Sequence, residues 1–243
     1  MPRLDASRAL VIGGGRRLGR AIALGLAEHG ADVAVTSRAA GADAEETAAA
    51  IRAFGRRAAA LACDVRSVDE IGGAVAGAAE ALGGLDVLVY AAAGGFRAAR
   101  PEDVDAALFD EAVGTILRGG FFAAQAAHAE MGEGGGVIVF ITDVAALQAW
   151  PSFAPHSVAK AGLVHLTKVL AKAWAPQVRV CGVAPGTVLP EADSDPGSAA
   201  RAASAAALGR VGLPDDIAGA VRYLVEAEYV TGIQLIVDGG RLL

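Results

Sequence analysis

Short runs of aliphatic and β-branched residues alternate along the chain with longer segments in which apolar positions recur every three or four residues. The short runs are typical of buried strands, and the longer segments of amphipathic helices. The runs predict strands at residues 9–12, 32–36, 58–62, 87–90, 137–141, 178–183 and 234–237. The helical spacing predicts helices at 18–28, 44–54, 68–82, from about 104 and from about 110, and at 153–173, 199–207 and 214–225.

This alternation predicts an α/β protein. Strands that are apolar throughout are typical of a parallel sheet covered by helices on both faces. No Pro/Ser-rich linker interrupts the pattern, so residues 1–243 are predicted to form one domain around a doubly wound parallel sheet. The polar loop at 185–198, part of a wider lid region at 185–213, follows a strand, where such sheets bind ligands. It is either a lid that sets specificity or a plain surface loop.

Composition and charge exclude several classes of protein. Hydrophobic residues make up 54% of the 243 residues and the net charge is -6, which excludes a disordered or collagen-like chain. The acidic balance, without a cluster of Lys or Arg, argues against nucleic acid as the main partner. No apolar run is long enough for a membrane helix, and residues 1–15 do not resemble a signal peptide. We therefore expect neither nucleic acid nor membrane as a partner.

Residue usage adds two observations. The two cysteines, Cys63 and Cys181, form neither a disulfide framework nor a metal-ligand spacing, so a reducing, cytoplasmic location is the simplest interpretation. The chain has 18 arginines, only three lysines and no asparagine. A biased codon supply would explain the scarcity of lysine and the absence of asparagine.

A glycine-rich turn joins the first predicted strand to the first predicted helix. Glycines let the backbone approach a pyrophosphate, and the helix N-terminus supplies N–H groups and a partial positive charge. The turn therefore predicts a nucleotide site, although many glycine-rich turns are only turns and its two arginines could be plain surface residues. The candidate contacts are Gly13, Gly15, Arg16, Arg17, Leu18 and Gly19.

The end of the second predicted strand indicates which dinucleotide binds. Dehydrogenases that prefer NAD usually place an acidic residue here to bind the ribose hydroxyls. This chain instead has Ser37 and Arg38, and an arginine can pair with a 2′-phosphate. We therefore expect NADP(H) as the cofactor rather than NAD(H). At the end of the third strand, Asp64, followed by Val65, could accept a hydrogen bond from the adenine amino group.

Several motifs together make the chain resemble the short-chain dehydrogenase/reductase family along its whole length. They are the glycine-rich turn, Cys63-Asp64-Val65, Ser157-Val158-Ala159-Lys160-Ala161-Gly162, Val183-Ala184-Pro185-Gly186 and Val237-Asp238-Gly239-Gly240. The resemblance implies a Rossmann-type sheet of about seven strands, a nicotinamide dinucleotide, a small-molecule substrate and a homo-oligomer, either a tetramer or a dimer. It also implies cofactor contacts from Ala92, Lys160, Pro185, Gly186 and Val188.

The chain departs from that family where the family carries its catalysis. The family uses a Tyr-x-x-x-Lys pair on one helix, a Ser on the preceding strand end and an Asn on an earlier helix. The matching positions here hold His156, four residues before Lys160, and Asp143 and Ile116. The family's Asn-Asn-Ala-Gly turn is replaced by the segment at 90–94. Codon bias explains the lost asparagines more easily than His156, because three tyrosines remain elsewhere.

Some of these departures are shared with pteridine reductases and their bacterial dihydropterin-reducing relatives. Those proteins carry a turn similar to Arg16-Arg17-Leu18-Gly19 and an Asp at the position of Asp143. The segments at 185–190 and 238–243 are also similar. The resemblance makes Phe96 a candidate for packing a planar substrate against the nicotinamide, with a loop residue at the core edge as the alternative.

Other ring-bearing residues are less informative. Trp150 and Phe153 could line the substrate pocket, or belong to the core or to a subunit contact. His29, His128 and His165 are isolated in the sequence, and His165 is predicted on the helix face opposite His156. We therefore predict no metal site.

The predicted catalytic residues are Asp143, His156 and Lys160. His156 and Lys160 share one helix face, and a charged imidazole could donate a proton to a carbonyl or imine. Asp143 would raise the pKa of the His156 imidazole and Lys160 would lower it, and the sequence does not decide which effect is larger. Alternatively, His156 is a binding or spacer residue, or the site lacks redox activity.

Our hypothesis is an NADP(H)-dependent short-chain reductase that transfers a hydride to a carbonyl or imine of a small, cyclic, pterin-like substrate. One alternative is a protein of the same fold that binds NADP(H) or a metabolite without redox activity and supports a partner. Another is a non-redox enzyme on that fold.

Overall fold

The strands form a parallel sheet whose order differs from their order in the chain. The computed structural model describes residues 4–38, 41–188 and 197–243, and its sheet runs in the order β3-β2-β1-β4-β5-β6-β7 with every neighbouring pair parallel. The strands are β1 (Arg8–Ile12), β2 (Asp32–Ser37), β3 (Ala58–Ala62), β4 (Val87–Tyr90), β5 (Gly136–Ile141), β6 (Val178–Pro185) and β7 (Gln234–Val237). The prediction of a doubly wound, Rossmann-type sheet of seven strands is confirmed.

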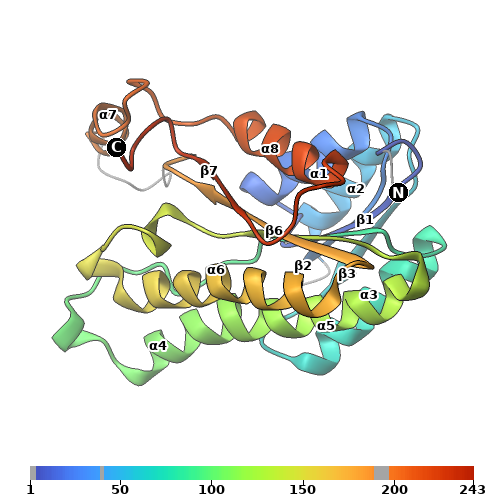
Figure 1. The fold of residues 1–243 in the computed structure, drawn as a ribbon, viewed down its shortest axis with the longest axis horizontal. Helices are drawn as coiled ribbons and strands as arrows, with labels where there is room; N and C mark the ends of the chain where they lie inside the picture. Colours follow the sequence, from blue (N-terminus) through green and yellow to red (C-terminus); the bar gives the residue numbers. More distant parts are fainter. Residues whose placement is uncertain (1–3, 39–40, 189–196) are drawn as a thin grey trace.

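Helices cover both faces of the sheet (Figure 1). The first face carries α1 (Arg17–Glu28), α2 (Ala42–Ala53) and α8 (Pro214–Glu226). The second carries α3 (Val68–Leu82), α5 (Gly119–Met131) and α6 (Ala154–Trp174). The remaining short elements are α4 (Ala106–Ala112), α7 (Ser198–Ser204) and 3₁₀ turns at Pro101–Asp103, Gly132–Gly134, Val144–Ala146 and Pro151–Phe153.

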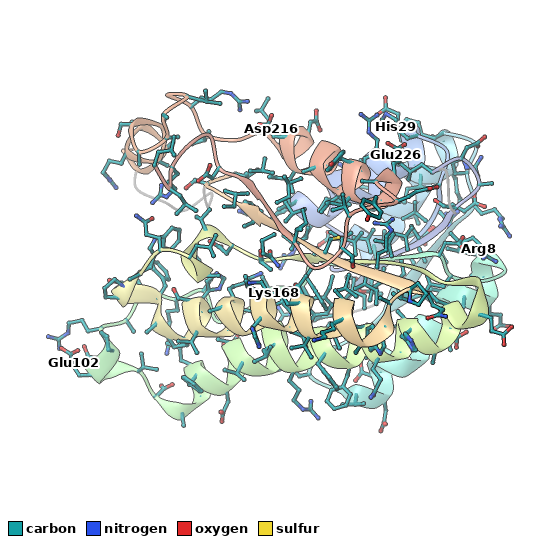
Figure 2. All side chains as sticks on the ribbon, in the orientation of Figure 1. Arg8, His29, Glu102, Lys168, Asp216 and Glu226 are labelled. Atoms are coloured by element: carbon teal, nitrogen blue, oxygen red, sulfur yellow. The ribbon has the colours of Figure 1, made fainter. Side chains whose placement is uncertain are left out.

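Each face of the sheet packs against its own layer of helices. Successive side chains of a strand point to opposite faces, so Leu10 and Ile12 join the core under α3, α5 and α6, whereas Ala9 and Val11 join the core under α1 and α8. All four side chains are completely buried, and side chains fill the space between sheet and helices on both sides (Figure 2). This two-sided burial explains why the strands are apolar throughout.

The segment after β4 differs from the prediction of two separate helices. α4 continues into α5 through a π-helical segment, η2 (Val113–Arg118). Tyr90, at the end of β4, is completely buried and its hydroxyl donates to the carbonyl of Thr115 inside η2. A Cβ on Gly119 would overlap the Tyr90 hydroxyl, so the glycine makes room for this contact. The hydrogen bond from Tyr90 occurs where the helix widens into a π-helical turn. The spacing of apolar residues along the chain does not predict such a turn.

The C-terminal third contains the predicted loop region. α7 ends at Ser204, three residues before the predicted end, and residues 189–196 of the predicted lid lie outside the described residues. Val188 and Gly212, on either side of that gap, pair in a parallel bridge.

Among the described helices, none combines the length and apolar character needed to cross a bilayer.

Candidate functional site

The glycine-rich turn lies between β1 and α1. Gly13 adopts a φ of 82°, a conformation that favours glycine, and its N–H donates to the Thr36 hydroxyl at the end of β2 over 3.1 Å. A Cβ on Gly19 would overlap the Gly13 carbonyl oxygen, so only glycine lets α1 pack this closely on the turn. A Cβ on Gly13 would lie 3.0 Å from the backbone nitrogen of Ala92. The turn and the end of β4 therefore lie side by side, as the predicted cofactor contacts require.

The beginning of α1 suits an anion. The residue before the helix, Arg16, makes no side-chain capping hydrogen bond, and the first turn of the helix contains no acidic residue. Arg16 precedes the helix in an extended conformation, and the side chains of Arg16 and Arg17 are both exposed. Backbone N–H groups at a helix N-terminus carry partial positive charge and bind phosphate groups. The residues present therefore fit a pyrophosphate.

The ends of β2 and β3 form the next part of this edge. A Cβ on Gly15 would lie 3.3 Å from the side chain of Ser37, so the turn approaches β2 closely. Arg38 is exposed, and its positive charge acts on the carboxylate of Asp64. Hydrogen bonds from Arg66, together with the weaker effect of Arg38, lower the pKa of Asp64 to about 2. Asp64 is therefore an ionised acceptor beside Arg38.

The sequence did not predict the partner of Asp64. The Arg66 guanidinium lies 2.5 Å from an Asp64 carboxylate oxygen and donates to both oxygens. Each carboxylate oxygen can accept more than one hydrogen bond, so this pairing leaves Asp64 able to bind an amino group. Val65 is buried and contributes to the core beside it.

Asp143 follows β5 and uses both of its carboxylate oxygens within the protein. Oδ1 accepts the N–H of Ala145 at 2.8 Å and so begins a 3₁₀ turn. Oδ2 lies 3.2 Å from Nε2 of His156, on the first turn of α6. The Asp143 side chain is about a quarter exposed. Asp143 is therefore held by its own backbone turn in a position that fixes the imidazole.

His156 is almost completely buried, with 3% of its surface exposed. With Nε2 directed at Asp143, the second ring nitrogen, Nδ1, is buried and has no hydrogen-bond partner among the described residues. Buried polar atoms are nearly always paired, so an orphaned one needs an explanation. Nδ1 is the ring nitrogen of His156 that remains for a ligand.

Lys160 lies one helical turn beyond His156. Its Nζ donates to the carbonyl of Ile141, at the end of β5, over 2.7 Å, and the side chain is buried. Burial lowers the pKa of Lys160 to about 8, and the negative charge of Asp143 acts in the opposite direction. The structure thus brings Asp143, His156 and Lys160 together.

Three predicted aromatic contacts form a row that starts at His156. Phe96 meets the imidazole edge-on with 4.9 Å between ring centroids, and Phe96 and Phe153 stack at 4.4 Å with an interplanar angle of 14°. Trp150 follows at 6.2 Å from Phe153. The Arg241 guanidinium lies over the Trp150 ring at 5.2 Å, a contact that the sequence did not predict. Phe96 is 43% exposed, so the row reaches the surface.

The ends of β6 and β7 border a cavity of about 460 Å³. Gly186 lines it, and the Gly186 N–H donates to the Val237 carbonyl at 3.0 Å. Pro185 is buried at the end of β6, and Val188 is half-buried in its bridge to Gly212. These predicted cofactor contacts lie at the end of β6 or just after it, at the same edge of the sheet as the glycine turn and Asp143, because all the strands are parallel.

No metal centre is found within the described ranges, since no three His, Cys, Asp or Glu side chains gather there in a suitable group. His128 instead stacks on Trp174 with 4.5 Å between ring centroids. His29 lies 2.8 Å from the Gly25 carbonyl in the preceding helical turn. His165 is exposed on α6.

Comparisons with known proteins show which family the chain belongs to. A family model described as enoyl-(acyl carrier protein) reductase matches residues 14–241. The L-rhamnose 1-dehydrogenase (NAD(P)(+)) of Azotobacter vinelandii is 37% identical over 243 residues, with 95% of this chain and 94% of that protein covered. A crystal structure of a short chain dehydrogenase from Burkholderia cenocepacia in complex with NADP is 35% identical, with a TM-score of 0.92 and 100% of both chains covered. A short-chain dehydrogenase/reductase from Serratia marcescens is 34% identical, with a TM-score of 0.93 and 99% of both chains covered. The chain therefore belongs to the short-chain dehydrogenase/reductase family.

Proposed function

We propose that the protein is an NADP(H)-dependent reductase that transfers a hydride to a carbonyl or imine of a small, cyclic, pterin-like substrate, with His156 as the proton donor. One observation carries the proposal: Nε2 of His156 lies 3.2 Å from Asp143, while Nδ1 has no hydrogen-bond partner among the described residues. A histidine held through one nitrogen, with the other nitrogen unpaired, is arranged for proton transfer.

The residues at the carboxyl ends of the strands would hold the cofactor. The glycine turn and the beginning of α1 would bind the pyrophosphate, Arg38 the 2′-phosphate, and Asp64 the adenine. Names of relatives support a nicotinamide dinucleotide, since the Azotobacter enzyme is named for NAD(P)(+) and the Burkholderia structure contains NADP. The choice of NADP(H) rests on Arg38. A bound dinucleotide would supply the hydride.

Each polar side chain of the cluster has a separate role in this proposal. Asp143 orients the imidazole through Nε2 and stabilises its positive charge, so Nδ1 can give a proton to the substrate. Lys160 uses one N–H for the Ile141 carbonyl, and an ammonium has two more for the ribose hydroxyls. The charge of Lys160 opposes that of the imidazolium, which favours release of the proton to the substrate.

The row of rings supports a planar substrate. Phe96 lies against the imidazole and is partly exposed, so a flat ring bound beside it would come close to His156. The pterin-like class rests on the similarity of the segments at 16–19 and 238–243, and of Asp143, to pteridine reductases.

The burial of His156 favours a second candidate function. Only 3% of His156 is exposed and its Nδ1 is buried, so a substrate reaches Nδ1 only if side chains around the imidazole move. A protein that binds NADP(H) or a metabolite without hydride transfer would need no such movement.

The two candidates differ in the outcome of one substitution. Under the proposal, His156→Ala lowers NADPH oxidation with ketones or dihydropterins by about 100-fold or more, because general acid catalysis is lost. NADPH affinity, measured by titration, changes less than twofold. His165→Ala, which removes an exposed histidine of the same helix, is the matched control and leaves both values unchanged.

Unchanged turnover in the His156 variant would refute the assigned role. Binding of NADPH without oxidation by any substrate of the panel would favour the second candidate. Failure of the wild-type chain to bind a dinucleotide would refute the proposed reductase.

A further inference from the structure

We propose that the substrate of this reductase carries a carboxylate group and that Arg241 binds it. The inference rests on the proposed function, because it extends the same site away from His156. The guanidinium of Arg241 lies over the Trp150 ring at 5.2 Å, and its Nε is buried with no hydrogen-bond partner among the described residues. A buried charged donor without an acceptor is costly, so its position calls for a ligand.

The acidic side chain nearest to Arg241 in sequence is already committed. Asp238 accepts the N–H of Gly240 through Oδ1 at 2.8 Å and the N–H of Leu242 through Oδ2 at 2.9 Å. These two bonds close the backbone turn that carries Arg241. Within the described part of the chain, no carboxylate forms an ion pair with this guanidinium. Its planar fork of donors therefore remains for an external acceptor.

The path from Arg241 to the catalytic cluster is continuous. Trp150 packs against Phe153, Phe153 stacks on Phe96, and Phe96 meets His156. A flat, conjugated molecule lying along these rings would gain aromatic contacts over its length. Its reacting carbonyl would lie at the His156 end and its anionic group at the Arg241 end.

The charges along this path favour an anion over a neutral polar group. Lys160 and Arg241 are both positive, and the carboxylate of Asp143 is already bound by Ala145 and His156. A guanidinium matches a carboxylate with two parallel hydrogen bonds, which fixes orientation as well as affinity. The expected substrate class is therefore a planar aromatic or heteroaromatic carbonyl compound with a carboxylate.

A matched pair of ketones tests this assignment. Para-acetylbenzoate and its methyl ester share the ring and the ketone, and the ester replaces the carboxylate with a neutral group that is one methyl larger. We expect Arg241→Gln to raise KM for the acid at least about tenfold, to change KM for the ester less than twofold, and to leave kcat for the ester unchanged. Arg241→Lys, which keeps the charge but loses the fork, should give an intermediate KM for the acid.

Arg52→Gln is the matched control. Arg52 is an exposed arginine of α2, paired with Glu45 at 2.7 Å, so neither KM should change. Equal effects of Arg241→Gln on acid and ester, or no effect on either, would overturn the inference.

A second measurement does not depend on turnover. The chain has two tryptophans, Trp150 and Trp174, so Trp174→Phe leaves Trp150 as the only tryptophan reporter. Addition of para-acetylbenzoate should quench its fluorescence, and Arg241→Gln should weaken that binding at least about tenfold. Far-UV circular dichroism checks that each variant is folded.

The two readouts separate the failure of this inference from that of the proposed function. If the wild-type protein binds the acid through Arg241 but oxidises NADPH with neither these ketones nor any dihydropterin, the carboxylate site stands and the reductase proposal fails. If it reduces both ketones with equal KM and the acid does not bind in an Arg241-dependent way, the reductase stands and the inference is overturned.

Discussion

Replacing Lys160 with methionine should stabilise the protein at neutral pH, and the gain should disappear as the pH rises. Only 4% of Lys160 is exposed, and burial lowers its pKa from the ordinary 10.5 to about 8. The unfolded chain therefore binds this proton more tightly than the folded chain. Below pH 8 the buried ammonium opposes folding, and this opposition is lifted as the pH rises from about 8 to 10.5.

The size of the effect follows from the two pKa values. The difference between 10.5 and about 8 corresponds to roughly 3 kcal/mol of unfolding free energy. The lost hydrogen bond to the Ile141 carbonyl offsets about 1 kcal/mol of that gain. We therefore expect Lys160→Met to be more stable than the wild-type protein by about 2 kcal/mol at pH 7. Integrating the linkage relation, the stability advantage of Lys160→Met should fall by roughly 2 to 3 kcal/mol between pH 7 and pH 10.

Urea unfolding at both pH values, followed by far-UV circular dichroism, measures this change. Lys168→Met is the matched control, because Lys168 is exposed on the same helix, α6 (Figure 2). The difference in unfolding free energy between the wild-type protein and Lys168→Met should be the same at pH 7 and at pH 10. If the corresponding free-energy difference for Lys160→Met is also the same at both pH values, the reasoning is refuted. The same substitution removes the ammonium proposed to bind the ribose, so added stability should accompany weaker NADPH binding.

Two further substitutions test other parts of the site. Arg38→Ala should weaken NADPH binding by roughly tenfold or more and NADH binding less than twofold, because only NADPH carries the 2′-phosphate. Titration followed by nicotinamide fluorescence measures both affinities, and equal losses would contradict the choice of cofactor. Tyr90→Phe should lower the unfolding free energy by about 1 kcal/mol, because the carbonyl of Thr115 in η2 loses its donor. Urea unfolding checks this, and an unchanged midpoint would show that the hydroxyl contributes nothing to η2.

The sequence was sufficient for features that depend on neighbours in the chain. The apolar run at 137–141 is observed as β5 (Gly136–Ile141), because strand periodicity is local and the run is buried on both faces. The spacing of His156 and Lys160 likewise placed both on one face of α6. Asp143 was expected near them only because the family resemblance implied it, and the structure has its carboxylate 3.2 Å from His156. The glycines at 13–19 indicated the close turn between β1 and α1 for the same reason.

Only the tertiary structure decided which distant groups meet. The hydroxyl of Tyr90 reaches a carbonyl 25 residues away, where periodicity alone predicted two separate helices. The stacking of Phe96 on Phe153 and the position of Arg241 over Trp150 join segments that are far apart in the chain. Burial of His156, and the choice of Nε2 rather than Nδ1 as the partner of Asp143, depend on those same contacts. Local patterns fix which elements form, whereas contacts between side chains depend on the path that brings those elements together.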